Sequence, residues 1–87
     1  MNGKPGNAAI RILLFAGLRE QAGWAERLWP SANAAPSSLT PRAIWPQLGV
    51  AVALEDLRVA INQQFADADA PLQGGDELAF LPPISGG

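Results

Sequence analysis

Residues 77–87 read Glu-Leu-Ala-Phe-Leu-Pro-Pro-Ile-Ser-Gly-Gly, and this stretch decides how the rest of the chain is interpreted. Side chains alternate between the two faces of an extended strand, so Leu78 and Phe80 share one face. Ala79 and Leu81 share the other. The two prolines that follow end the strand, because proline cannot donate a hydrogen bond to a neighbouring strand. The stretch therefore predicts a last β-strand with a tail behind it.

The tail, residues 82–87, is predicted to be flexible and functional. Gly86 and Gly87 leave a terminal carboxylate on a thread without side chains, which can enter a narrow channel of another protein. A carboxylate is a poor electrophile at neutral pH. Once it is joined to AMP, the same carbon becomes reactive toward a sulfur or amine nucleophile. The alternative is a glycine-ended terminus that has no function.

Another strand is predicted near the start of the chain, over residues 9–16. The segment is short and rich in branched and aromatic side chains, which favours a strand over a helix. Alternation divides it into an aliphatic face and a mixed face, namely Ile10, Ile12 and Leu14 against Arg11, Leu13 and Phe15.

The segments between these two strands predict an α+β fold. Thr40 and Pro41 are typical of a helix start, and Pro46 should keep that helix short or kinked. The other predicted elements are a helical turn over 18–23, an edge strand over 26–30, a strand over 57–62 and a short return over 65–67. We expect one sheet with one main helix packed on one face.

A single helix leaves the other face of the sheet open. Leu13, Phe15 and Leu81 would lie on that face or at its rim. Clustered exposed apolar side chains usually mark a surface for a partner. The alternative is that loops cover them.

Composition narrows the possible chemistry. The chain has 87 residues and contains neither cysteine nor histidine, so cysteine nucleophiles, histidine bases and zinc sites built from these residues are excluded. We expect one domain, residues 1–87, with a disordered arm over 1–8. The net charge of −2 and the lack of a long apolar run argue against nucleic acid and membrane as partners. A cytoplasmic location is the simplest expectation.

Other candidate sites are weaker. Acidic residues gather near the predicted turns before the last strand, where carboxylates beside glycine and proline usually form turns rather than bind metal. Gly74 and Gly75 are followed by no helix, so a hairpin turn is favoured over a phosphate loop. Trp24, Trp29 and Trp45 are expected to pack rather than to stack on a ligand. We expect no metal site and no permanently bound cofactor.

Three segments resemble the small subunit of molybdopterin synthase, a ubiquitin-like sulfur carrier with the β-grasp fold. The segments are 12–20 with its Phe-Ala-Gly-Leu-Arg-Glu ending, 59–63 with Val-Ala-Ile-Asn-Gln, and 71–87 almost throughout. The similarity spans roughly residues 10 to 87. The resemblance implies a β-grasp fold, which is a mixed sheet with one main helix.

The resemblance also implies roles for individual residues. Gly87 would carry the adenylate and then the thiocarboxylate, with Gly86 and Ser85 beside it in the tail. The residues that match positions near the partner surface are Phe15, Arg19, Leu81, Pro82, Pro83 and Ile84.

The partners implied by the resemblance are an adenylating enzyme that consumes ATP, a sulfur donor enzyme and the large synthase subunit, with which the chain would form a heterotetramer. The carrier itself would be a non-catalytic sulfur-donating subunit that passes sulfur to cyclic pyranopterin monophosphate in molybdenum cofactor biosynthesis. Two alternatives stay open: a carrier for another pathway, such as thiamine or tungsten cofactor synthesis, and a ubiquitin-like protein modifier.

Overall fold

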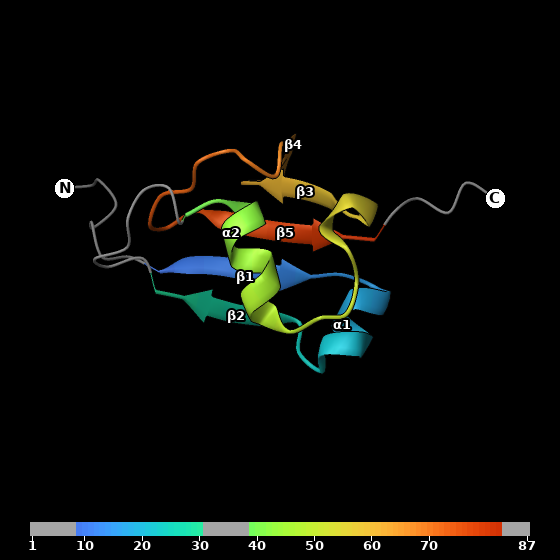
Figure 1. Ribbon diagram of the computed structural model, residues 1–87. Coiled ribbons are helices and arrows are strands. Elements are labelled where there is room, and N and C mark those ends of the chain that lie inside the picture. Colours follow the sequence, from blue (N-terminus) through green and yellow to red (C-terminus); the bar gives the residue numbers. More distant parts are fainter. Residues whose placement is uncertain (1–8, 31–38, 83–87) are drawn as a thin grey trace.

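The computed structural model describes residues 9–30 and 39–82, and the account below is confined to them. One five-stranded sheet carries the fold (Figure 1). Its strands are β1 (Ile10–Leu14), β2 (Glu26–Trp29), β3 (Arg58–Ile61), β4 (Gln64–Ala66) and β5 (Glu77–Leu81). The helical segments are α1 (Gly17–Ala22), α2 (Pro41–Ile44), and the 3₁₀ turns η2 (Trp45–Leu48) and η3 (Leu54–Asp56). The predicted arm over 1–8 lies outside the described residues.

The strand order is β2-β1-β5-β3-β4, so the last strand lies at the centre of the sheet. β5 runs parallel to β1 and antiparallel to β3, and the outer pairs are antiparallel. The sheet is therefore mixed, and the prediction of an α+β fold is confirmed. Each strand predicted from the sequence is present.

The main helix is short, as Pro46 predicted. Thr40 caps its start, since Thr40 Oγ1 accepts a hydrogen bond from the Ala43 N–H at 3.1 Å, and Pro41 takes the first helical position. The α-helix ends at Ile44, and a 3₁₀ turn that contains Pro46 continues to Gly49, where φ is 74°. A left-handed residue of this kind ends a helix at little cost when it is glycine.

The core lies between the sheet and this helical layer. Ile12, Leu78 and Phe80 point from the sheet, and each is completely buried. Trp45 of the helical layer packs against Phe80, with the two ring centroids 4.6 Å apart. The Trp45 Nε1–H donates a hydrogen bond to the Val52 carbonyl oxygen at 2.8 Å. Trp45 thus buries a large ring without leaving its polar atom unpaired.

A polar network fixes the turn that precedes the central strand. Asp76 is buried and accepts hydrogen bonds from Asn62 Nδ2 at 3.1 Å and from the Gln73 N–H at 2.8 Å. The Asn62 side-chain oxygen accepts from the Glu77 N–H at 3.0 Å. These bonds join the β3–β4 turn to the start of β5. In the part of the chain that the structure describes, no group of three or more acidic side chains is placed to hold a metal ion.

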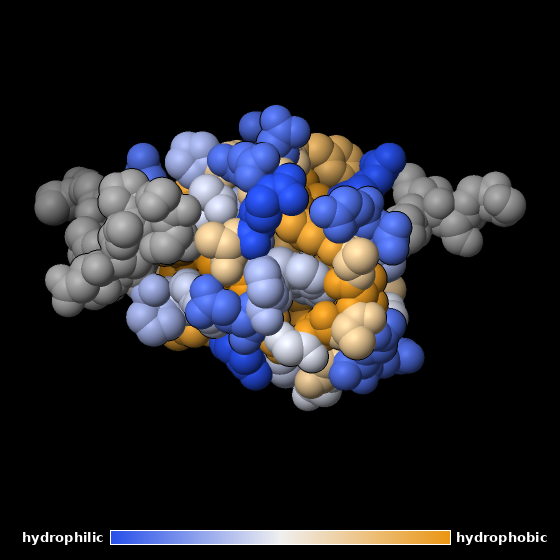
Figure 2. Space-filling view, in the orientation of Figure 1, coloured by the Kyte–Doolittle hydropathy of each residue, from blue (hydrophilic) through white to orange (hydrophobic). Residues whose placement is uncertain are grey.

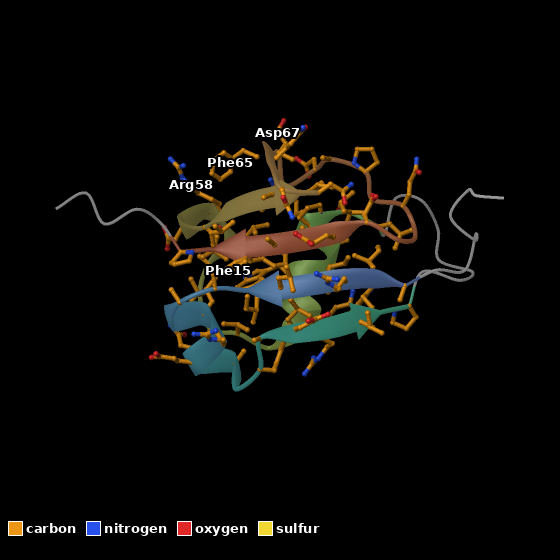
Figure 3. The ribbon with its side chains drawn as sticks, turned by 180° about the vertical axis from the view of Figure 1, so that it is seen from behind. Phe15, Arg58, Phe65 and Asp67 are labelled. Atoms are coloured by element: carbon orange, nitrogen blue, oxygen red, sulfur yellow. The ribbon has the colours of Figure 1, made fainter. Side chains whose placement is uncertain are left out.

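Among residues 9–30 and 39–82, the helical layer covers one face of the sheet (Figure 1). Seen from behind, the described elements leave the opposite face of β1, β5 and β3 open (Figure 3). No helix within residues 9–30 and 39–82 is long and apolar enough to cross a membrane.

Candidate functional site

The open face of the sheet is formed by the side chains that alternate along each strand with those pointing to the helical layer. In the central strand β5, Ala79 pairs with Leu13 of β1 on one side and with Ala60 of β3 on the other. Ala60 also pairs with Phe65 of β4. One row of outward side chains therefore crosses four strands. The predicted placement of Leu13, Phe15 and Leu81 away from the helix agrees with this register.

A shallow cavity of about 210 Å³ lies in the middle of this face. Its floor is made by Ala60 and Ala79, whose small side chains leave the space open. Phe15 and Phe65 stand at either side and remain 43% and 69% exposed (Figure 3). Leu81 closes the end of the cavity toward the tail. The hollow fits a protruding apolar side chain of another protein, because its floor is small and its walls are aromatic.

Charged side chains border the cavity. The Arg58 guanidinium lies 5.2 Å from the centroid of the Phe65 ring, a distance typical of a cation–π contact. At the opposite border, Arg11 Nε lies 3.2 Å from Glu26 and its Nη2 lies 3.3 Å from Glu77. The apolar patch thus has a polar border, as protein interfaces commonly do.

The turn after β1 sets the position of Phe15. The Leu18 N–H donates to the Phe15 carbonyl oxygen at 3.1 Å, and Ala16 between them has φ 53° and ψ −130°. Arg19 follows on α1, where it is exposed and does not line the cavity. A role for Arg19 in binding a partner stays a prediction.

The tail leaves the sheet beside this cavity. Leu81 and Pro82 are both half-buried at the end of the central strand. The other predicted tail and partner residues lie outside the described residues, namely Pro83, Ile84, Ser85, Gly86 and Gly87. Leu81, which directly precedes Pro82, lines the cavity between the two exposed phenylalanines.

Sequence reasoning did not identify Phe65, Arg58 or the alanine floor as part of this surface. A usable signal was present in the Asn62-Gln63 turn. Both residues have positive φ, 52° and 70°, as a two-residue hairpin turn requires. Such a turn places Ala60 opposite Phe65 and so brings Phe65 to the same face.

The sequence of the chain matches the ThiS family over residues 12–87. The chain belongs to the ThiS family. It is 36% identical over 85 residues to the molybdopterin synthase sulfur carrier subunit of Escherichia coli K12. The aligned region covers 90% of this chain and 99% of that relative. It is 35% identical to the Arabidopsis thaliana protein of the same name, over 90% of this chain and 82% of the relative. The resemblance predicted from the three segments is confirmed.

Solved structures agree on the fold. The small archaeal modifier protein 1 of Haloferax volcanii superposes with a TM-score of 0.66 at 27% identity and covers 92% of this chain and all of that one. Urm1 from Trypanosoma brucei has a TM-score of 0.67 at 16% identity, over 95% and 99% of the two chains. A complex of subunits 1 and 2 of the molybdopterin-converting factor from Helicobacter pylori contains a chain with a TM-score of 0.60 at 21% identity, over 91% and 99%. The ubiquitin-like β-grasp fold predicted for this member of the ThiS family is confirmed.

Proposed function

We propose that this member of the ThiS family is the sulfur carrier subunit of a molybdopterin synthase and that it holds sulfur as a thiocarboxylate on Gly87. The observation that carries the proposal is the 36% identity, over 90% of the chain, to a protein with that role in its name. The tail chemistry is consistent with it, since the chain has no cysteine on which sulfur could be held.

The loading step needs two displacements. An oxygen of the Gly87 carboxylate attacks the α-phosphorus of ATP in an adenylating enzyme, and pyrophosphate leaves. Hydrosulfide released by a donor enzyme then attacks the activated carbonyl carbon, and AMP leaves with the carboxylate oxygen that had been joined to phosphorus. The product is a thiocarboxylate. The carrier keeps no permanent cofactor in this proposal, because ATP is bound and consumed by the partner.

The unloading step takes place in the large subunit, where the loaded tail delivers sulfur to cyclic pyranopterin monophosphate. The open face of the sheet supports such docking, because the cavity between Phe15 and Phe65 lies beside the point where Pro82 begins the tail. In the Helicobacter structure the similar chain is one subunit of a two-subunit complex. We extend that arrangement to this chain, with the carrier at each end of a heterotetramer. ATP use by a partner enzyme is consistent with a cytoplasmic location.

The test is the intact mass of the protein after incubation with ATP, an adenylating enzyme and a sulfur source. We expect one oxygen to be replaced by one sulfur. A variant that lacks Gly87 should keep its fold and gain no sulfur. Asp56→Ala is the control and should load as the parent does, because Asp56 lies on η3 and does not line the cavity of the open face. An unchanged mass under conditions that load a known carrier overturns the proposal.

A second candidate is a ubiquitin-like modifier that is joined to lysine side chains. It is favoured by the 27% identity to a protein named small archaeal modifier protein 1. Both functions begin with adenylation, and they differ in the nucleophile that follows. Mass spectrometry of cellular proteins separates them, because the modifier leaves a C-terminal peptide of this chain joined to lysine through an isopeptide bond of Gly87 and the sulfur carrier does not.

A further inference from the structure

Arg58 lies at the end of the open face from which the tail leaves the sheet. It is the first residue of β3 and pairs with Leu81 of β5, and alternation places it on the same face as Ala60. Its side chain is exposed, and the guanidinium lies over the Phe65 ring (Figure 3). Leu81 and Phe65 both line the cavity, so a protein that covers the cavity also meets Arg58.

The charged side chains at the other end of this face are paired with one another. Arg11 of β1 lies 3.2 Å from Glu26 of β2 and 3.3 Å from Glu77, the first residue of β5. Glu77 and Leu81 are four residues apart on one strand, which separates them by about 13 Å. The two ends of the face therefore differ in charge. One end has two carboxylates around a single arginine, and the tail end has Arg58.

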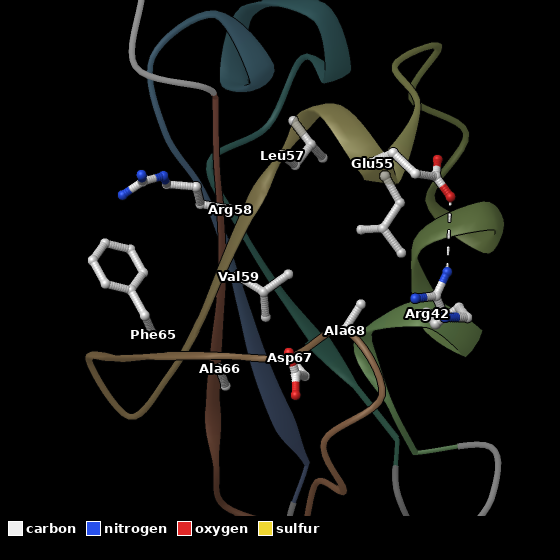
Figure 4. Close-up of a pocket in the computed structure, with 10 residues that line it drawn as sticks. Arg42, Glu55, Leu57, Arg58, Val59, Phe65, Ala66, Asp67 and Ala68 are labelled. Atoms are coloured by element: carbon white, nitrogen blue, oxygen red, sulfur yellow. Dashed lines mark ion pairs between the residues drawn. The ribbon is translucent and has the colours of Figure 1, made fainter.

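Arg58 has no carboxylate partner in the part of the chain that the structure describes. It also borders a hollow of about 500 Å³ at the β4 edge, where the carboxylates are those of Glu55 and Asp67. Glu55 pairs with Arg42, with oxygen and nitrogen 3.8 Å apart. The Arg58 guanidinium points toward Phe65 and away from Asp67 (Figure 4). The ring contact leaves the charge of Arg58 and the N–H groups at the edge of its guanidinium available.

A partner that covers the open face brings this guanidinium into the interface. Removal of a charge from water is unfavourable unless an opposite charge replaces the lost hydrogen bonds. A carboxylate fits the guanidinium best, because its two oxygens accept two parallel N–H bonds. A cation would be repelled, and an apolar group would leave the donors unpaired. The contact with Phe65 also holds Arg58 in place beforehand, which lowers the entropic cost of pairing.

We propose that Arg58 selects a partner with an aspartate or glutamate opposite the tail end of the open face. The ion pair orients the docked carrier, because it forms beside Leu81, where the tail begins, and not at the end of the face that holds Arg11. Arg58 is a specificity residue in this proposal and takes no part in sulfur transfer. The inference rests on the proposed function in one respect, which is that a partner protein covers the open face.

The test is binding of the full chain to the large synthase subunit by surface plasmon resonance, at about 50 mM and about 300 mM sodium chloride. We expect Arg58→Gln to lower the association rate about five- to tenfold at the lower salt concentration, and to make binding less sensitive to salt. Arg58→Glu should lose more than Arg58→Gln, because two carboxylates then face each other. Arg58→Leu, which keeps an apolar side chain, should not restore binding.

Arg27→Gln is the matched control. Arg27 is also an exposed arginine with a ring contact, 4.2 Å from the Trp24 centroid, and no ion pair links it to a carboxylate within residues 9–30 and 39–82. It pairs with Ile12, whose side chain points to the helical layer, so it belongs to the opposite side of the sheet. Figure 2 shows that side, where hydrophilic side chains lie among hydrophobic ones. Arg27→Gln removes the same charge and should bind as the parent does.

Four outcomes overturn the inference. Equal binding by the parent and Arg58→Gln means that Arg58 meets no charge, and tighter binding by Arg58→Glu means that the partner has a cation there. An equal loss in Arg27→Gln means that only the net charge matters. A parent chain that sediments alone as a dimer, with Arg58→Gln a monomer, assigns the carboxylate to a second copy of this chain. Failure of the parent to bind the large subunit overturns the proposed function, and the inference with it.

Discussion

Ala16 holds a backbone conformation that glycine adopts more easily than alanine. Its φ of 53° and ψ of −130° place it at the first central position of the turn closed by the Leu18 N–H and the Phe15 carbonyl oxygen. Turns of this geometry favour glycine there, because a Cβ is crowded at positive φ. Residues in such sparsely populated regions cost about 1–3 kcal/mol.

The perturbation is Ala16→Gly. Removal of the Cβ should recover that strain, and the greater backbone entropy of glycine in the unfolded chain offsets about 0.5–1 kcal/mol of it. A net stabilisation of about 1 kcal/mol follows, which corresponds to a rise in Tm of about 4–8 °C for a domain of this size. Ala22→Gly is the control, since Ala22 lies in α1 and should lose about 0.5–1 kcal/mol.

The assay is urea unfolding followed by tryptophan fluorescence, because Trp45 is buried in the core and becomes exposed on unfolding. The two variants should shift the midpoint in opposite directions with the same slope. If Ala16→Gly loses as much stability as Ala22→Gly, the turn stores no strain and the reasoning is refuted.

Three further predictions concern polar groups. Asp76→Ala should cost about 1–3 kcal/mol of unfolding free energy, because it removes two part-buried hydrogen bonds of a buried carboxylate. A loss equal to that of the exposed Asp56→Ala would contradict this. Thr40→Ala should cost about 1 kcal/mol in the same assay, with Thr40→Ser restoring most of it through the retained hydroxyl. Asp69, through its hydrogen bond and its charge, raises the pKa of Arg42. The stability that the charged Arg42 contributes is therefore fully present below its pKa in the unfolded chain. It is lost only as pH rises through the higher pKa of the folded state. The difference in unfolding free energy between the parent and Arg42→Gln should therefore stay constant from about pH 7 to about pH 10, and a steady decline across that range would show the sign to be wrong.

Local patterns were sufficient to predict most of the elements. The alternation in Ile10–Leu14 and in Glu77–Leu81 predicted both strands and the side chains that each turns inward. Pro46 predicted the early end of the main helix, because a proline removes one backbone hydrogen bond wherever the helix is placed. These effects act between residues that are close in the sequence, so they can be predicted without the tertiary structure.

The docking surface could be predicted only in part. Phe15 and Leu81 were identified from alternation and from the resemblance to the family. Phe65 was not, because its side of the sheet depends on the register that the Asn62-Gln63 turn imposes on β3 and β4. The floor formed by Ala60 and Ala79 was also not predicted, because a small side chain indicates a cavity only when the larger side chains around it in space are known.

The sequence by itself determined the class of fold, the faces of the strands and the absence of any thiol or imidazole, because each depends on composition or on short-range alternation. Only the tertiary structure decided that the last strand lies between the first and the third, which places Leu81 in the cavity of the open face. It alone brought Phe65 of β4 to the same cavity as Phe15 at the end of β1. Such neighbours are set by strand order and register, and these follow from packing of the whole chain rather than from any segment of it.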